Sequence, residues 1–192
     1  MQPIGPLMIE HRLIERMVAL MGQELARLKD NIAVAAEFAF VDPVFIDTAV
    51  DFIRTYAGHC HHGKEENILF AALADKDLTP EHRQAMEELI EDHRWGDRTI
   101  VSLVQAKGDY LLEKAGALDD LLLHLEALAV FYPLHIEKED KHFFLPCMNY
   151  FSEVEKAQML ERMWEFDRKM IHDKYRGVVE ALEHGKTCKT CR

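Results

Sequence analysis

The sequence predicts an all-α protein, an up-down four-helix bundle with an additional C-terminal helix. Apolar residues recur at helical spacing through several long segments, and no strand-like alternation persists. Only nine glycines and six prolines interrupt the 192 residues, which suits long helices. Long helices joined by short connections pack as neighbours, so four of them form a bundle against which the fifth lies.

Helix start signals place the first three helices. Apolar spacing predicts the first over residues 7–28. Asp42-Pro43 combines an N-cap with a proline at the first helical position, and it opens a second helix over residues 43–74. Thr79-Pro80 repeats this signal and opens a third helix over residues 80–107.

The last two helices follow from similar signals. Apolar spacing predicts a fourth helix over residues 118–144. Ser152 and Glu155 have the spacing of a capping box and open a fifth helix that reaches Glu183. We therefore expect one bundle domain over residues 1–185.

A flexible polar tail is expected over residues 186–192. It contains Cys188 and Cys191, spaced as in a redox dithiol or half of a tetrahedral metal site, although two exposed thiols are the simpler interpretation. With Cys60 and Cys147 the chain has four cysteines, too few for a disulfide scaffold at this length. A reducing, cytoplasmic location is therefore expected.

Composition excludes several classes of partner. The net charge of −11 argues against nucleic acid and against an anionic membrane surface. No run approaches the eighteen or so apolar residues of a membrane span, and no signal peptide is recognisable at the N-terminus. The sequence therefore predicts no nucleic-acid partner and no membrane association.

Two copies of one short pattern are the most informative feature. The segments His61-His62-Gly63-Lys64-Glu65-Glu66 and His135-Ile136-Glu137-Lys138-Glu139-Asp140 each contain His-x-x-x-Glu. This spacing puts an imidazole and a carboxylate one turn apart on one face of a helix. A single pair is commonplace, but two copies within long apolar segments suggest opposite walls of one metal site.

One histidine on each bundle helix falls on or beside the apolar stripe: His11, His61, His93 and His135. A lone histidine on an apolar face is usually a satisfied core residue, but here that explanation must hold independently on four helices. Burying these imidazoles and two carboxylates without partners would cost ~1–3 kcal/mol per group. A metal ion removes that cost, and ligation without thiolates suits iron, manganese or zinc.

Four segments in this order resemble the hemerythrin-like family, also called the HHE cation-binding domain: 10–16, 61–66, 91–93 and 135–140. The resemblance runs from about residue 7 to 180 and implies a bundle around a non-haem, oxo- or hydroxo-bridged di-iron centre. Carried over to this chain, it implies His11, His61, His93 and His135 as terminal ligands and Glu65 and Glu139 as bridging ligands. A ferritin-like site is disfavoured because it would need Glu-x-x-His pairs.

The chain departs from the hemerythrin pattern at one ligand. Hemerythrin has a fifth histidine one turn after the ligand on its third helix, where this sequence has Asp97. With four histidines, two bridging carboxylates and a bridging oxygen, two positions of two octahedral irons remain for water, substrate or another side chain. The nearest side chains for a further ligand are Asp97, Glu15 and Tyr132, with His172 on the fifth helix a weaker candidate.

The other histidines are expected to lie outside the ligand set. His62 and Glu66 lie about 100° around the helix from His61 and Glu65, so we expect them to face solvent or a neighbouring helix. His142 is expected to line the site without binding metal. Surface positions are expected for His59, His82, His124 and His184. A dry pocket beside the metal could be formed by Ile14, Ile68, Leu69, Phe131 and Phe143.

Three functions remain open on the sequence. The first is a di-iron protein that binds O2, NO or peroxide for sensing, scavenging or iron handling. The second is a di-iron redox enzyme that reduces peroxide or oxidises a small substrate, with an electron donor as its partner. The third is a structural zinc or single-iron site. A homo-oligomer is compatible with each of them.

Overall fold

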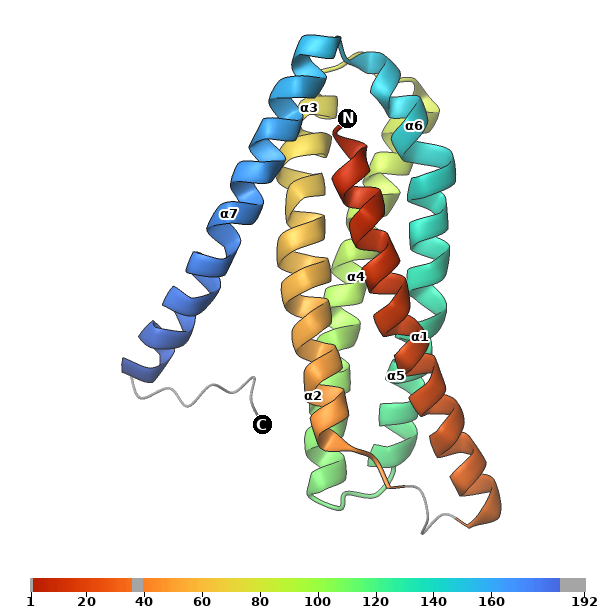
Figure 1. Ribbon diagram of the computed structural model, residues 1–192. Helices are drawn as coiled ribbons and strands as arrows, with labels where there is room; N and C mark the ends of the chain where they lie inside the picture. The colour runs from red at the N-terminus through yellow and green to blue at the C-terminus, as the bar shows by residue number, and fades with distance from the viewer. Residues whose placement is uncertain (1, 36–39, 184–192) are drawn as a thin grey trace.

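The computed structural model describes residues 2–35 and 40–183, with side chains described as far as residue 170. Five long helical rods make up this part of the chain, and it contains no strand (Figure 1). The first rod is α1, Ile4–Val34. The second joins α2 (Pro43–Phe52), η2 (Ile53–His62), η3 (Glu65–Phe70) and α3 (Ala71–Ala74), and we call it the α2 rod.

The third rod is α4, Pro80–Leu111. The fourth, which we call the α5 rod, joins α5 (Ala117–Lys138), η4 (Glu139–Phe143) and α6 (Phe144–Cys147), and the 3-10 turn η5 (Met148–Tyr150) follows it. The fifth is α7, Glu153–Glu183. The predicted all-α bundle with an extra C-terminal helix is confirmed.

Local capping explains where the rods begin. The Asp42 carboxylate accepts hydrogen bonds from two backbone N–H groups at the start of α2, and the Thr79 hydroxyl accepts one at the start of α4. Ser152 and Glu155 bond to each other's backbone N–H groups before α7, as a capping box does. Gly116, with φ 80°, supplies the left-handed turn that opens α5.

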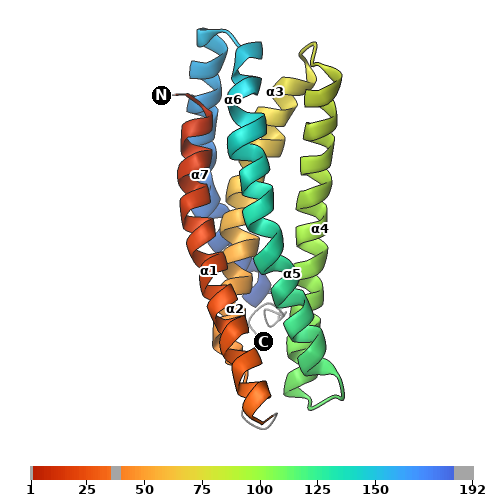
Figure 2. The same cartoon turned by 90° about the vertical axis from the view of Figure 1, so that its right-hand side faces the viewer.

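The rods alternate in direction, and four of them close into a ring (Figures 1 and 2). Around the bundle, α1 contacts the α2 rod, which contacts α4, which contacts the α5 rod, which contacts α1 again. This cyclic order is the up-down four-helix bundle. Each of these four rods therefore faces one shared interior.

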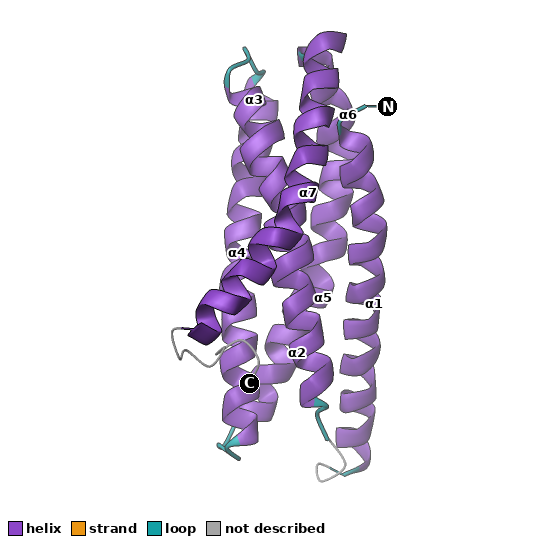
Figure 3. Ribbon diagram, turned by 60° about the vertical axis from the view of Figure 1, so that its left-hand side comes forward, coloured by secondary structure: helices purple, strands orange, loops and turns teal. Residues whose placement is uncertain are grey.

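Helix α7 lies outside the ring, across the α2 rod, where it contacts η2 and η3 (Figure 3). Met159 and Met163 are buried there against the bundle. Gly63 permits this close approach, because a Cβ at that position would lie 2.9 Å from the Phe166 ring. The extra helix thus covers the rod that carries the first His-x-x-x-Glu copy.

Two apolar clusters fill the bundle: an upper cluster at the end that contains α3 and α6, and a lower cluster at the end where α2 begins. On α1 the upper cluster ends at Leu7 and the lower one begins at Ile14, with His11 between them. The other helices also carry buried polar side chains at this level. The core is therefore divided by a polar layer, which is where a site has to be sought.

The predicted tail of residues 186–192, with Cys188 and Cys191, lies outside the described residues. In the described part of the chain, no helix combines the length and apolar character needed to cross a membrane. Cys60 and Cys147 are both buried free thiols.

Candidate metal centre

The structure brings all six predicted ligand side chains together in the polar layer. Each of the four ring helices contributes one histidine, and the α2 and α5 rods each add one glutamate. All six are at least 97% buried, and they are His11, His61, Glu65, His93, His135 and Glu139. Burial this complete removes water as a partner for these groups.

The inward-facing atoms of this cluster make no hydrogen bond in the described structure. They are the Nε2 atoms of the four histidines and all four carboxylate oxygens of the two glutamates. Eight buried polar atoms without hydrogen bonds would be costly, at ~1–3 kcal/mol per group. Such a concentration in one place indicates a missing common partner, and a metal cation is the partner that suits imidazole nitrogen and carboxylate oxygen together.

The spacing of these atoms also fits metal ions. Ligand atoms that each lie about 2.1 Å from an ion, at right angles to one another, are about 3 Å apart. The nearest nitrogen–oxygen distances here are close to that value. They are 3.1 Å for His11–Glu139, 3.2 Å for His61–Glu65, 3.3 Å for His93–Glu65 and 3.4 Å for His135–Glu139.

The outer nitrogen of each histidine is held by a carboxylate from a neighbouring helix. The Nδ1–oxygen distances are 2.8 Å for His11–Asp140, 3.0 Å for His61–Glu10, 2.6 Å for His93–Glu66 and 3.4 Å for His135–Asp92. We call these four acids the carboxylate ring, because their bonds pass once around the bundle. A donor at Nδ1 leaves Nε2 free as a ligand and fixes the ring's orientation.

Sequence reasoning did not assign the carboxylate ring, although a signal was present. Each of its members is the immediate chain neighbour of a predicted ligand: Glu10 of His11, Glu66 of Glu65, Asp92 of His93 and Asp140 of Glu139. Neighbours on a helix point in different directions. While one side chain points inward, the acid beside it reaches the next helix and orients the histidine there.

Within the cluster, the positive charge of protonated histidines balances the negative charge of the buried glutamates. Burial lowers the pKa of His61 and of His93, but nearby carboxylates raise these pKa values to about 10 and to about 9. Burial raises the pKa of Glu139, yet His135 and other histidines hold it well below its usual range. Without metal, protons therefore supply the positive charge that the buried carboxylates require.

The candidate ligand atoms form two groups, each spanning less than 4.8 Å. One group contains His11, His61, Glu65 and Glu139, and the other contains His62, His93 and His135. Oxygens of both glutamates lie within 4 Å of His93 Nε2, so these carboxylates connect the two groups. Two candidate metal-binding groups therefore lie next to each other in the polar layer.

His62 is the residue whose position the sequence described least well. The sequence predicted that it faces either solvent or a neighbouring helix. It faces a neighbouring helix, because its ring stacks on His93 of α4, with centroids 3.8 Å apart. It is also buried within the polar layer. The wider π-helical turns of η2 and η3, with i→i+5 hydrogen bonds, reduce the angle between successive residues, so His61 and His62 both point inward.

The other side chains considered from sequence have different places. Glu15 pairs with Arg12 at 3.2 Å on a partly exposed face of α1. Asp97 is exposed. Tyr132 is buried, and burial together with the Asp97 and Glu139 charges raises its pKa, which favours a neutral phenol over a phenolate.

The structure also tests the positions predicted for the other histidines. The expectation that His142 lines the site is wrong: it is exposed, because η4 turns Glu139 and Phe143 inward instead. His59 is exposed as expected, while His82 is partly buried against the Tyr150 hydroxyl and His124 is partly buried. The side chain of His172, and all of His184, lie outside the described residues.

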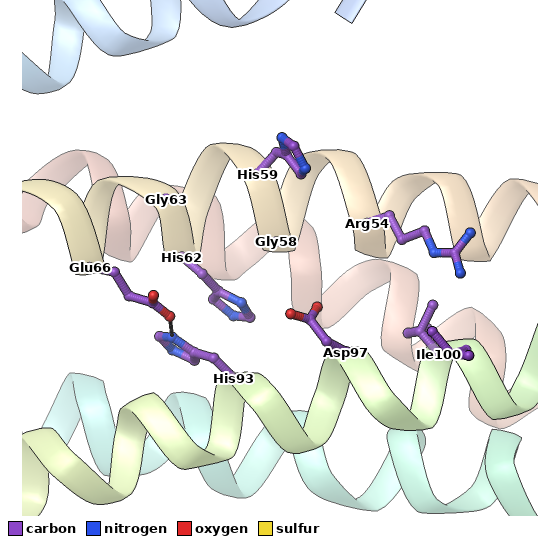
Figure 4. A pocket seen from close by; sticks show the side chains of 10 residues that line it. Arg54, Gly58, His59, His62, Gly63, Glu66, His93, Asp97 and Ile100 are labelled. Carbon is purple, nitrogen blue, oxygen red and sulfur yellow. Dashed lines mark hydrogen bonds and ion pairs between the residues drawn. The ribbon is translucent and has the colours of Figure 1, made fainter. Parts of the chain in front are cut away.

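A pocket of about 380 Å³ reaches the polar layer between the α2 rod and α4. Figure 4 shows His62 of the α2 rod next to His93 of α4, with Asp97 pointing from α4 toward the α2 rod. Further lining residues are Arg54, Gly58, His59, Gly63, Glu66, Ile100 and Val101. Charged and histidine side chains line this pocket beside apolar ones, so it differs from the dry apolar pocket expected from sequence.

The residues expected to form that dry pocket instead flank the polar layer. Ile14 and Phe131 belong to the lower apolar cluster, and Ile68, Leu69 and Phe143 belong to the upper one. Apolar walls above and below the layer keep water from the inner atoms and strengthen electrostatic interactions there.

Fold and site together define a metal-binding helical bundle. The sequence matches the hemerythrin HHE cation-binding domain over residues 2–147, well over half of the chain, and the chain belongs to this family. In the corresponding comparisons, no curated protein and no solved structure matches it. Membership of a cation-binding family agrees with the histidine and carboxylate clusters in the polar layer.

Proposed function

We propose that this protein holds two iron ions in the polar layer and binds O2, NO or peroxide at them. The ligands are His11, His61, His93 and His135, with Glu65 and Glu139 bridging the ions. The eight inward-facing atoms without hydrogen bonds carry the proposal, because two cations satisfy all of them at once. Zinc and manganese suit the same donor atoms.

The protein contributes orientation, exclusion of water and an entry route. When bound, iron supplies the one-electron chemistry that amino-acid side chains lack. The carboxylate ring fixes the histidines, and the apolar clusters close the layer above and below. The pocket between the α2 rod and α4 admits a small ligand to the His62 and His93 side of the layer.

The charged side chains in this pocket favour a second candidate, a redox enzyme acting on peroxide. Arg54, His62 and Asp97 offer charged and hydrogen-bonding groups along the route, which suits a hydrophilic substrate more than an apolar gas. An electron donor would then be the partner. Absence of peroxide turnover with every reductant tried would eliminate this candidate.

The deciding experiment is metal analysis of protein purified without oxygen, combined with Mössbauer spectroscopy. We expect two irons per chain, and a new absorption band when O2, NO or azide is added. The variant Glu139→Gln should lose at least one iron, whereas Glu137→Gln, exposed on the same rod, should keep both. One zinc per chain and no response to small ligands would favour a structural site instead.

Location and assembly are part of the proposal. Two buried free thiols, Cys60 and Cys147, are compatible with a reducing cytoplasm. A homo-oligomer is compatible with the exposed apolar residues on α1 and α5, among them Leu20, Leu123 and Val130. Sedimentation of the purified protein would measure the oligomeric state directly.

A further inference from the structure

His62 combines features that the proposed ligand set does not explain. Its imidazole is buried, 7% exposed, in a layer otherwise filled by the six proposed ligands and their partners. In the described part of the chain no hydrogen bond holds either of its ring nitrogens. Its recorded contacts are ring contacts with other histidines, and a cation in the polar layer is a partner that suits such a side chain.

The surroundings of His62 identify the missing partner. One nitrogen of its ring lies within 4.8 Å of a ligand nitrogen of both His93 and His135. The ring is nearly parallel to that of His93, at 6°, and meets that of His135 edge-on. These nitrogens lie close enough together for one cation, and the His62 ring, which no hydrogen bond from the described residues fixes, can turn out of its stack on His93 to bind it.

We propose that His62 is a seventh protein ligand, binding the second ion together with His93 and His135. The inference rests on the proposed two-ion function and makes it more specific. Three histidines then belong to the second ion and two, His11 and His61, to the first, with Glu65 and Glu139 shared. The position that Asp97 leaves unfilled on α4 is thus compensated by η2 of the neighbouring α2 rod.

His62 also differs from the other histidines in two ways that bear on reactivity. No carboxylate orients its outer nitrogen, whereas a carboxylate holds each of the other four. It lines the entry pocket, together with His93 (Figure 4). An imidazole without an anchor at the pocket is the ligand that an incoming molecule displaces most readily, because no second bond resists its rotation.

Cobalt(II) titration of the metal-free protein tests this ligation without any reaction. Its visible absorption strengthens when the coordination number falls. We expect wild type to bind two Co(II) per chain. His62→Ala should bind the first normally and the second at least about tenfold more weakly, with stronger absorption per ion. Added imidazole should reverse both changes, since the pocket admits it.

Two further variants make the result decisive. His59→Ala removes an exposed histidine at the rim of the same pocket and should behave as wild type. His62→Gln keeps a polar side chain of similar length and decides the question on the same measurements if the alanine variant does not fold by circular dichroism.

The outcomes separate this proposal from the function on which it rests. If wild type binds two Co(II) and both His62 variants match it in affinity and absorption, His62 is not a ligand and only this inference fails. If wild type binds fewer than two ions, the two-ion function fails and the inference fails with it.

Discussion

At the scale of the residue, the site depends on pairs in which one side chain orients another. Asp140 illustrates this, because it accepts a hydrogen bond from His11 Nδ1 at 2.8 Å and also pairs with Arg12. The first contact holds the imidazole so that Nε2 faces the polar layer. The second, on an exposed arginine, contributes little to stability.

Asp140→Asn should therefore weaken metal binding much more than folding. We expect the affinity for Zn²⁺ to fall about 10–100-fold, as is usual when a partner of a metal-binding histidine is altered. Calorimetric titration measures this affinity, with Glu137→Gln as the matched control on the same rod. Unchanged affinity in Asp140→Asn would show that the carboxylate ring does not support the metal.

At the scale of the element, one buried lysine forms ion pairs that connect three helices. Lys64, on the α2 rod, is fully buried and pairs with Glu10 of α1 and with Asp167 of α7, at 2.6 Å in the second case. Cys60 and Asp167 are also in contact, with Sγ and Oδ1 3.4 Å apart. The Lys64 ammonium compensates these acids, so this cluster needs no metal ion.

Lys64→Met should destabilise the metal-free protein by about 3 kcal/mol, near the lower end of the range for breaking a buried ion pair. Glu10 loses one cationic partner but keeps His61, which limits the cost. Urea unfolding measures the change, and Lys141→Met, at an exposed pair with Glu137, should stay within about 0.5 kcal/mol. Equal stability of both variants would contradict a joining role for Lys64.

At the scale of the whole molecule, the polar layer divides the core, and its charge balance links stability to pH. The pKa of His61 is raised to about 10 and that of His93 to about 9, above the ordinary value of 6.5. Groups with raised pKa values stabilise the folded state fully below pH 6.5. This contribution is lost as pH rises toward 10, because the folded state then releases the protons.

The metal-free protein should therefore lose stability between pH 6.5 and 10, by a few kcal/mol in total. Metal competes with these same protons, so the stabilisation by bound Zn²⁺ should grow over that pH range, and binding near pH 7.5 should release about two protons. Thermal unfolding with and without Zn²⁺ at several pH values checks this. A metal-free protein whose stability does not change across the range would refute it.

Much of the fold was predictable from sequence because its signals are local. Asp42-Pro43, Thr79-Pro80 and the Ser152–Glu155 box each act within one turn of helix, so they place helix starts without knowledge of the rest. The ends are less exact: the first helix was expected over residues 7–28 but spans Ile4–Val34, since apolar spacing marks only its buried face.

Spacing along single helices was enough to predict the helices, their apolar faces and the six side chains that meet in the interior. How neighbouring helices combine these side chains depends on their packing in three dimensions. The carboxylate ring joins acids on one helix to histidines on the next, and single-helix periodicity contains no such information. His62 points inward because η2 and η3 have π-helical turns, where the 100° step of an α-helix no longer applies.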